Sequence, residues 1–512
     1  MNKRALGAAA FLAAGALTAC SAGHTAYVPT TAPGKSASSA VVLASTSPAN
    51  SLDFTTTGGA AIPAALMSNV YETLVRIDPE SGEIVPHLAT GWRVNEAGTE
   101  YTFALREGVS FSDGAAFNAE TAAFSINYVR EKWTNGLKSQ MDAVAAAEAI
   151  GENTLKVTLA RPSNKWLWSM GTVTGAMMHE GAVGELSSKP VGTGPFMVAG
   201  FSPNEFVSLT INPDYWGKAP ARDVTIRYFP DAMSAVNALQ SGGADIVWAV
   251  QAPELLSNLP DEYRTTVGTT NGEVVLSMNN QVAPFDDPRV RQAVAYAVDR
   301  NAANDILWDA AATDTGGAPV PPTDPWFSGK DYYPHDPDKA RELLAEAGAT
   351  GAHITITVPT LPYAQTISEL LYSQLTEVGF EVELESAEFP AMWLAQVMGA
   401  KDYQMSIVSH VEPRDITTLF GSPEYYLGYD SPTVRDLFAK ADTESEEAAS
   451  TQLMGRAVDH IMEDMGALTL MNMPNIVLTR EGVTGVRPDQ VTDAIELRDV
   501  DFTPRAGGDT ND

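Results

Sequence analysis

A short segment late in the chain gathers four ionisable side chains: His410, Glu412, Arg414 and Asp415 directly follow the alternating stretch 405–409. An imidazole, two carboxyl groups and a guanidinium this close together can contact a charged or polar solute. One charge-assisted hydrogen bond contributes about 1.5–3 kcal/mol where water is excluded. The alternative is structural, with Arg414 and Asp415 forming a local ion pair on a surface loop. The sequence leaves both interpretations open.

Two βαβ patterns indicate how such a loop is positioned. Apolar residues alternate in 224–228, a helical pattern covers 233–240, and an apolar strand returns at 245–248. The second unit has an alternating strand at 354–358, a helical apolar face over 367–378, and a strand at 380–384. A period of two, then 3.6, then two again is typical of parallel strands joined by a crossover helix. The spacing of the two units predicts two α/β lobes.

Ligands of open parallel sheets bind beyond the carboxyl ends of the strands. Five loops qualify by that criterion: 45–53, 230–231, 250–251, 359–363 and 410–415. In the first of these loops, Ser47 and Asn50 are candidates for binding the main chain of a peptide. Tyr363 could stack on a ligand or staple the start of the following helix. Trp248 and Trp393 could line the cleft, although buried aromatic residues more often belong to the core.

The catalytic motifs are missing from this sequence. There is no GxSxG nucleophile elbow, no HExxH pair among the seven histidines, and one cysteine in all. The sequence therefore predicts no enzyme activity, no metal site and no cofactor. The formal charge of −32 also argues against a nucleic-acid-binding surface.

The N-terminus has the composition of an export signal. Lys3 and Arg4 precede a short apolar run that ends in Leu-Thr-Ala-Cys, which resembles the lipobox of bacterial lipoproteins. We therefore expect a signal peptide over 1–19, acylation of Cys20, and a flexible tether over 20–40 that is rich in small and polar residues. The Gly- and Asp-rich end, 506–512, is expected to be disordered.

Several sequence blocks resemble a known family. They are 69–75 (NVYETLV), 86–92 (PHLATGW), 101–120 (YTFALREGVSFSDGAAFNAE), 191–196 (VGTGPF), 212–216 (NPDYW) and 284–300 (PFDDPRVRQAVAYAVDR). The chain is identified by these blocks as a member of family 5 of the solute-binding proteins of ABC importers, the oligopeptide-, dipeptide- and nickel-binding type. Most of these blocks are expected to build cores.

The resemblance implies a two-lobed periplasmic-binding-protein-like α/β fold of type II, with an extra α+β domain inserted in the first lobe. Lobe I would comprise 41–69, 189–271 and 470–505, the extra domain II 70–188, and lobe III 272–469. It implies a monomeric, lipid-anchored receptor outside the cell membrane. This receptor would close on a small peptide-like solute and pass it to a permease and its ATPase; a metal chelate, a sugar or another small amino compound is the alternative ligand.

The resemblance also suggests roles within the segment 410–415. In peptide-binding relatives a carboxylate of this loop pairs with the peptide ammonium, and here either Glu412 or Asp415 matches that role. Dipeptide-binding relatives hold the peptide carboxylate with a basic residue at the position of Leu361, which puts strict dipeptide specificity in doubt unless Arg414 substitutes. Nickel-binding relatives use a histidine in a similar loop, which makes His410 a candidate ligand of a nickel chelate. A lone histidine, however, is more often a hydrogen-bonding residue.

Overall fold

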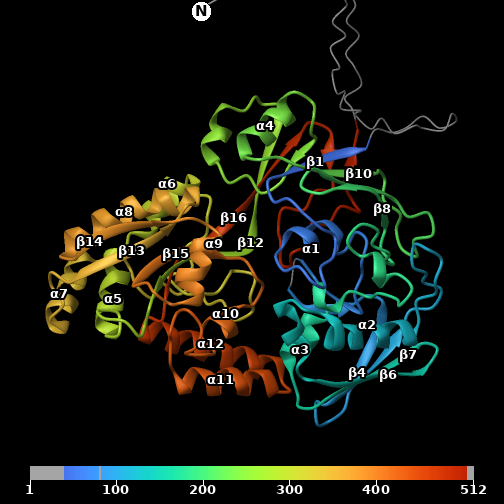
Figure 1. Ribbon diagram of the computed structural model, residues 1–512, viewed down its shortest axis with the longest axis horizontal. Coiled ribbons are helices and arrows are strands. Elements are labelled where there is room, and N and C mark those ends of the chain that lie inside the picture. The colour runs from blue at the N-terminus through green and yellow to red at the C-terminus, as the bar shows by residue number, and fades with distance from the viewer. Residues whose placement is uncertain (1–39, 80–81, 504–512) are drawn as a thin grey trace, which may run out of the picture. The chain divides into compact units, whose positions relative to one another are not determined.

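The computed structural model describes residues 40–79 and 82–503 (Figure 1). Cys20, the signal peptide, nearly all of the tether and the tail 506–512 lie outside the described residues. Among the helices of the described ranges, none combines the length and apolarity that a membrane span requires.

A ten-stranded mixed sheet forms the centre of the fold. One half contains β11, β1, β10, β9 and β8, in which β1 pairs in parallel with β10 and β11; the other half contains β15, β13 and β14, also paired in parallel. In spatial order the strands are β14 (Glu381–Ala387), β13 (His353–Pro359), β15 (Met405–His410), β12 (Tyr263–Met278), β16 (Leu468–Arg480), β11 (Ile246–Val247), β1 (Val41–Ser45), β10 (Val224–Tyr228), β9 (Phe206–Ile211) and β8 (Phe196–Ser202).

Two long antiparallel strands connect the halves of this sheet. β12 pairs with β15 over 273–278, β16 pairs with β11 at 478–479, and the two strands pair with each other along most of their length. Their register is interrupted between Thr269 and Glu273, in the middle of the ladder. Figure 1 shows β12 and β16 running side by side between the two groups of elements.

Both predicted βαβ units are present. In the first, β10 leads through α4 (Ala232–Gln240) to β11, and the Asp231 side chain caps the helix by accepting from the Ser234 N–H. In the second, β13 leads through α8 (Pro362–Val378) to β14, and Gly379 ends the helix in the left-handed conformation. Helix α8 begins earlier than the apolar pattern indicated, so Tyr363 lies in its first turn.

The remaining elements surround this sheet or form a smaller one. A four-stranded antiparallel sheet is covered by α2, and two short hairpins complete the strands. Their strands are β4 (Ala89–Val94), β5 (Glu100–Leu105), β7 (Thr154–Leu159) and β6 (Val144–Gly151), then β2 (Val75–Ile77) with β3 (Ile84–Pro86) and β17 (Val483–Thr484) with β18 (Asp501–Phe502). The other helices are α1 (Ala61–Leu66), α2 (Ala119–Lys132), α3 (Asn164–Ser169), α5 (Pro288–Ala297), α6 (Arg300–Trp308), α7 (Pro337–Ala347), α9 (Ala391–Trp393), α10 (Ile416–Leu419), α11 (Pro432–Thr443) and α12 (Glu447–Asp464), with short 3₁₀ or π turns at η1 (Gly136–Met141), η2 (Val173–Gly175), η3 (Val183–Glu185), η4 (Pro253–Asn258) and η5 (Leu394–Gly399).

The sequence blocks of the early chain meet at one buried carboxylate. Glu72 accepts hydrogen bonds from Thr193 Oγ1, Tyr215 Oη and Trp216 Nε1, each at 2.9 Å, and pairs with His87 Nε2 at 3.3 Å. Four blocks that are far apart in the sequence therefore build one structural node. The glycines of 191–196 serve the same node, since a Cβ at position 192 would lie 1.9 Å from a backbone oxygen.

A polar contact joins the segment 161–165 to helix α11. The Asp442 carboxylate accepts from Arg161 Nη1 at 2.5 Å, Ser163 Oγ at 2.8 Å and the Lys165 backbone N–H at 2.9 Å. The side chain of Asn164 adds hydrogen bonds to backbone oxygens at the end of α11. Asp442 thus sits at the N-terminus of α3, where a negative charge is favourable. We call this contact the α3–α11 clasp; the two helices lie next to each other in Figure 1.

Candidate functional site

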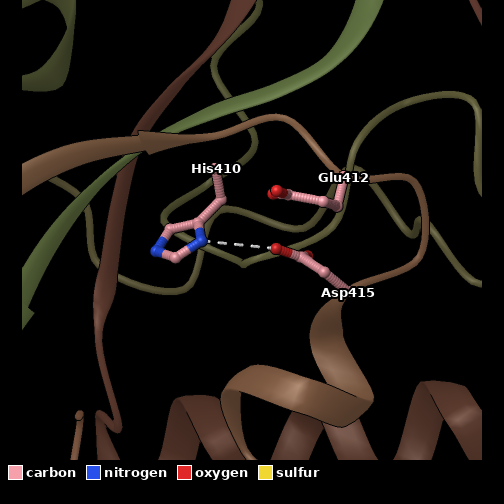
Figure 2. Close-up of side chains that lie close together, drawn as sticks. All are labelled: His410, Glu412 and Asp415. Carbon is pink, nitrogen blue, oxygen red and sulfur yellow. Dashed lines mark ion pairs between the residues drawn. The ribbon is translucent and has the colours of Figure 1, made fainter. Parts of the chain in front are cut away.

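The ionisable segment lies directly beyond the carboxyl end of β15, as expected from the topology. His410 ends the strand, and ligand atoms of His410, Glu412 and Asp415 lie within 4.8 Å of one another. Figure 2 shows both carboxylates turned toward the imidazole ring, with Asp415 Oδ2 3.4 Å from His410 Nδ1. One nitrogen and two carboxylates therefore face a common point.

His410 is held in this orientation by a buried partner. Its Nε2 lies 2.8 Å from the hydroxyl of Tyr426, and the two rings are stacked. His410 is 8% exposed and Tyr426 is 1% exposed. Because one ring nitrogen is occupied inside the core, Nδ1 is the nitrogen presented to the carboxylates.

Arg414 is directed away from the two carboxylates of its own loop. Its Nε lies 3.4 Å from Asp324 Oδ1, and its guanidinium stacks over Trp168 and Trp326, with ring centres 4.6 and 4.9 Å away. The residue has a positive φ of 55°. The local ion pair with Asp415 that the sequence allowed is not formed; Asp415 pairs with His410 instead. Arg414 thereby links loop 410–415 to α3.

Burial affects the pKa of the aspartate that pairs with Arg414. Asp324 is 8% exposed, and burial raises the pKa of its carboxyl to about 7. The charge of Arg414 opposes that rise and the charge of Asp415 adds to it. Asp324 therefore brings a third carboxyl group close to the loop.

Glu273 is a further acidic residue that the sequence analysis did not select. It stands opposite His410 on β15 and Asn472 on β16, so the three side chains share one face of the sheet. Glu273 is 2% exposed, and its Oε1 has no hydrogen-bond partner among the described residues. Burial, with the charges of Asp415 and Asp324, raises the pKa of this carboxyl well above its ordinary value. The sequence gives only a weak indication of Glu273, namely a single glutamate that precedes the apolar run Val274 to Leu276.

The C-terminal segment 487–496 lies near the loop 410–415. It is anchored to β12, where Asp489 Oδ1 accepts from the Thr269 N–H at 3.0 Å and Gln490 N–H donates to the Thr269 oxygen at 2.9 Å. Burial raises the pKa of Asp493 to about 7, and the charge of Glu412 contributes to the rise. Loop 410–415 and this segment are therefore electrostatic neighbours. No local pattern in the sequence indicated the role of Asp493.

Asp493 also lines a small cavity of about 40 Å³ that is partly open to solvent. Its walls come from α1, the segment 67–79, residues 171–173 and the C-terminal segment, with Trp248 at one side. Among the aromatic residues predicted for the site, Trp248 is the one that lines this cavity. This volume is far below the roughly 300–1,000 Å³ of small-molecule sites.

The other predicted residues occupy different surroundings. Tyr363 Oη accepts from the Ser409 N–H at 2.8 Å, and burial raises the pKa of Tyr363 to about 12. Trp393 lies in the core, and its Nε1 donates to Ser406 Oγ at 3.0 Å. Ser47 and Asn50 are exposed in the loop after β1, and neither lines the cavity described above.

Two groups of parallel strands bridged by long strands, with polar loops at their carboxyl ends, define a two-lobed solute-binding protein of the periplasmic type. The family model "Bacterial extracellular solute-binding proteins, family 5 Middle" matches residues 83–420, and the chain belongs to this family. Members of this class work outside the cytoplasm.

Individual relatives cover most of the chain at moderate identity. The glutathione-binding protein GsiB of Escherichia coli (strain K12) is 27% identical over 462 residues, covering 83% of this chain and 88% of the relative. Heme-binding protein A of Haemophilus influenzae is 28% identical over 352 residues, covering 62% of this chain and 64% of the relative, which is less than two thirds of its length. The solved structure of DppA from Helicobacter pylori in complex with the peptide STSA is 24% identical, with a TM-score of 0.75 over 91% of this chain and 98% of that one, and supports the fold.

Proposed function

We propose that this protein captures a small peptide-like solute through its positively charged amine, closes on it, and delivers it unchanged to an ABC permease energised by an ATPase. The mature chain starts at Cys20, acts as a monomer, and is held at the outer side of the cell membrane by its lipid. The lobe and domain boundaries given above, with β12 and β16 as the hinge, are part of this proposal.

The observation that carries the proposal is the placement of loop 410–415. Glu412 and Asp415 lie beyond the end of β15, and Glu412 is near Asp493 of the C-terminal segment. Arg414, the cation of this loop, is engaged by Asp324. A solute ammonium would therefore meet carboxylates without a competing guanidinium, and each such contact contributes about 1.5–3 kcal/mol. The names of the relatives, which refer to glutathione and to a complex with the peptide STSA, agree with this ligand class.

A divalent metal or its chelate is the second candidate ligand. His410 Nδ1 and the carboxylates of Glu412 and Asp415 form a set that could hold such an ion. The bond from Nε2 to Tyr426 fixes the ring as outer partners do in metal sites. This candidate predicts binding of nickel or zinc in the absence of any peptide.

The test compares Ala-Ala-Ala with N-acetyl-Ala-Ala-Ala and with Ni²⁺ in thermal-shift and calorimetric titrations. We expect the free tripeptide to stabilise the protein, since a ligand at 100 times its Kd adds about 2.7 kcal/mol. Acetylation should abolish that effect, as should Glu412→Gln or Asp415→Asn. Glu424→Gln is the matched control, because Glu424 has a side chain that is 89% exposed.

Three results would contradict the proposal. Equal binding of the acetylated peptide would remove the role of the ammonium. Stabilisation by Ni²⁺ alone, abolished by the same two substitutions, would favour the metal. A tripeptide that is converted to products, detected by mass spectrometry, would show an enzyme.

A further inference from the structure

The starting point is the position of Glu273 at the centre of the sheet. It is the first residue of β12 after the register interruption, beside His410 on one side and Asn472 on the other. Its side chain is almost fully buried, and its Oε1 has no hydrogen-bond partner among the described residues. A buried carboxyl without a partner is costly, so its retention calls for a ligand group that compensates it.

Around Glu273, acidic groups outnumber cationic ones in the described part of the chain. Five carboxyl groups gather here, and the guanidinium among them is already paired with one: Glu273, Asp324, Glu412, Asp415 and Asp493, with Arg414 on Asp324. A solute with one ammonium can compensate the loop carboxylates. It would leave the buried Oε1 of Glu273 without a hydrogen-bond partner among the described residues.

The geometry places a second position within reach of the first. Residues directly opposite each other on antiparallel strands have Cβ atoms about 4.5–5.5 Å apart. Glu273 and His410 are such a pair, and His410 Nδ1 is itself 3.4 Å from Asp415 Oδ2. The loop carboxylates and Glu273 are therefore close enough to be spanned by one short aliphatic chain.

We propose that the solute carries two positive groups, and that Glu273 receives the second one, an ammonium or guanidinium on a short aliphatic chain such as a basic peptide side chain. This inference rests on the proposed function, which supplies the first ammonium at Glu412 or Asp415. It adds that the same site selects basic solutes over neutral ones.

The test uses matched peptides and the full chain. Ala-Ala-Ala is compared with tripeptides that contain one lysine at the first, second or third position, and each lysine peptide has a norleucine counterpart of similar shape without the charge. Calorimetry should show one lysine isomer binding about 10- to 100-fold more tightly than its norleucine counterpart, the effect of one charge-assisted contact. Glu273→Gln should reduce that ratio to about one.

Glu385→Gln is the control variant, because Glu385 is an exposed acid on β14 of the same sheet and should not alter the ratio. A wild-type protein that binds lysine and norleucine peptides equally overturns this inference and leaves the proposed function standing. A protein that binds none of the peptides overturns both. If Glu273→Gln does not fold, the wild-type ratio still decides; if it folds and keeps the full ratio, Glu273 is not the receiving group.

Discussion

The α3–α11 clasp gives a quantitative prediction about closure. Asp442→Ala removes three hydrogen bonds between residues 161–165 and α11, which belong to different proposed lobes. The bond from Arg161, whose side chain is 57% exposed, contributes at most about 1 kcal/mol. The two others contribute about 0.5–1.5 kcal/mol each, so the clasp supplies about 2 kcal/mol in total.

That free energy should appear as lost affinity. If the clasp exists only in the closed form, and the open form predominates without solute, weakening it by about 2 kcal/mol lowers the apparent affinity about 30-fold. Calorimetry with whichever of the alanine, lysine and norleucine tripeptides binds most tightly measures this loss. Asp436→Ala is the control, since Asp436 lies on the same helix and pairs with Lys440, four residues on.

The melting temperature of the solute-free protein separates closure from folding. Ser163 Oγ still accepts from the Trp166 N–H and caps α3 without Asp442. We therefore expect Asp442→Ala to change the melting temperature of the solute-free protein little. An Asp442→Ala variant with wild-type affinity would refute the reasoning. So would equal losses of affinity in Asp442→Ala and Asp436→Ala.

Three other predictions concern stability and anchoring. Arg414→Gln should destabilise the solute-free protein by about 3 kcal/mol in denaturant unfolding, because it leaves the buried Asp324 without its partner; unchanged unfolding with lost binding would instead make Arg414 a ligand contact. Burial raises the pKa of Asp324 to about 7, and the charges of Arg414 and Asp415 also act on this carboxyl. Because the folded state retains the proton to higher pH than the unfolded state, the free energy of unfolding should fall as pH rises from about 4 to about 7 and then level off. Asp324→Asn should flatten this pH profile. Cys20→Ser should move the protein from the membrane fraction to the soluble fraction in cell fractionation, and an unchanged distribution would contradict lipidation at that residue.

Much of the fold could be predicted from local patterns. The two βαβ units were found because period two and period 3.6 survive in the sequence wherever one face of an element is buried. Helix ends were equally visible, as at Asp287, which caps α5 ahead of Pro288. The start of α8 was placed too late because Pro362 and Tyr363 precede its apolar stripe.

The candidate site was only half visible in the sequence. The loop 410–415 stood out because its four ionisable residues are contiguous and follow a recognisable strand. Asp324, Glu273 and Asp493 come from separate segments, and their proximity depends on strand register and loop packing that no local pattern encodes. The partner of Arg414 illustrates the same limit, since the nearest acid in sequence was Asp415 and the acid that binds it is Asp324.

The paired strands β12 and β16 have a mechanical consequence. Because they share a ladder on both sides of the interruption at 270–272, neither strand can turn without carrying the other with it. In the proposed closure, reorientation of one half against the other therefore has to pass through both strands at that level. Glu273 is the first residue after the interruption, so the residue that we assign to the solute lies at the proposed hinge itself.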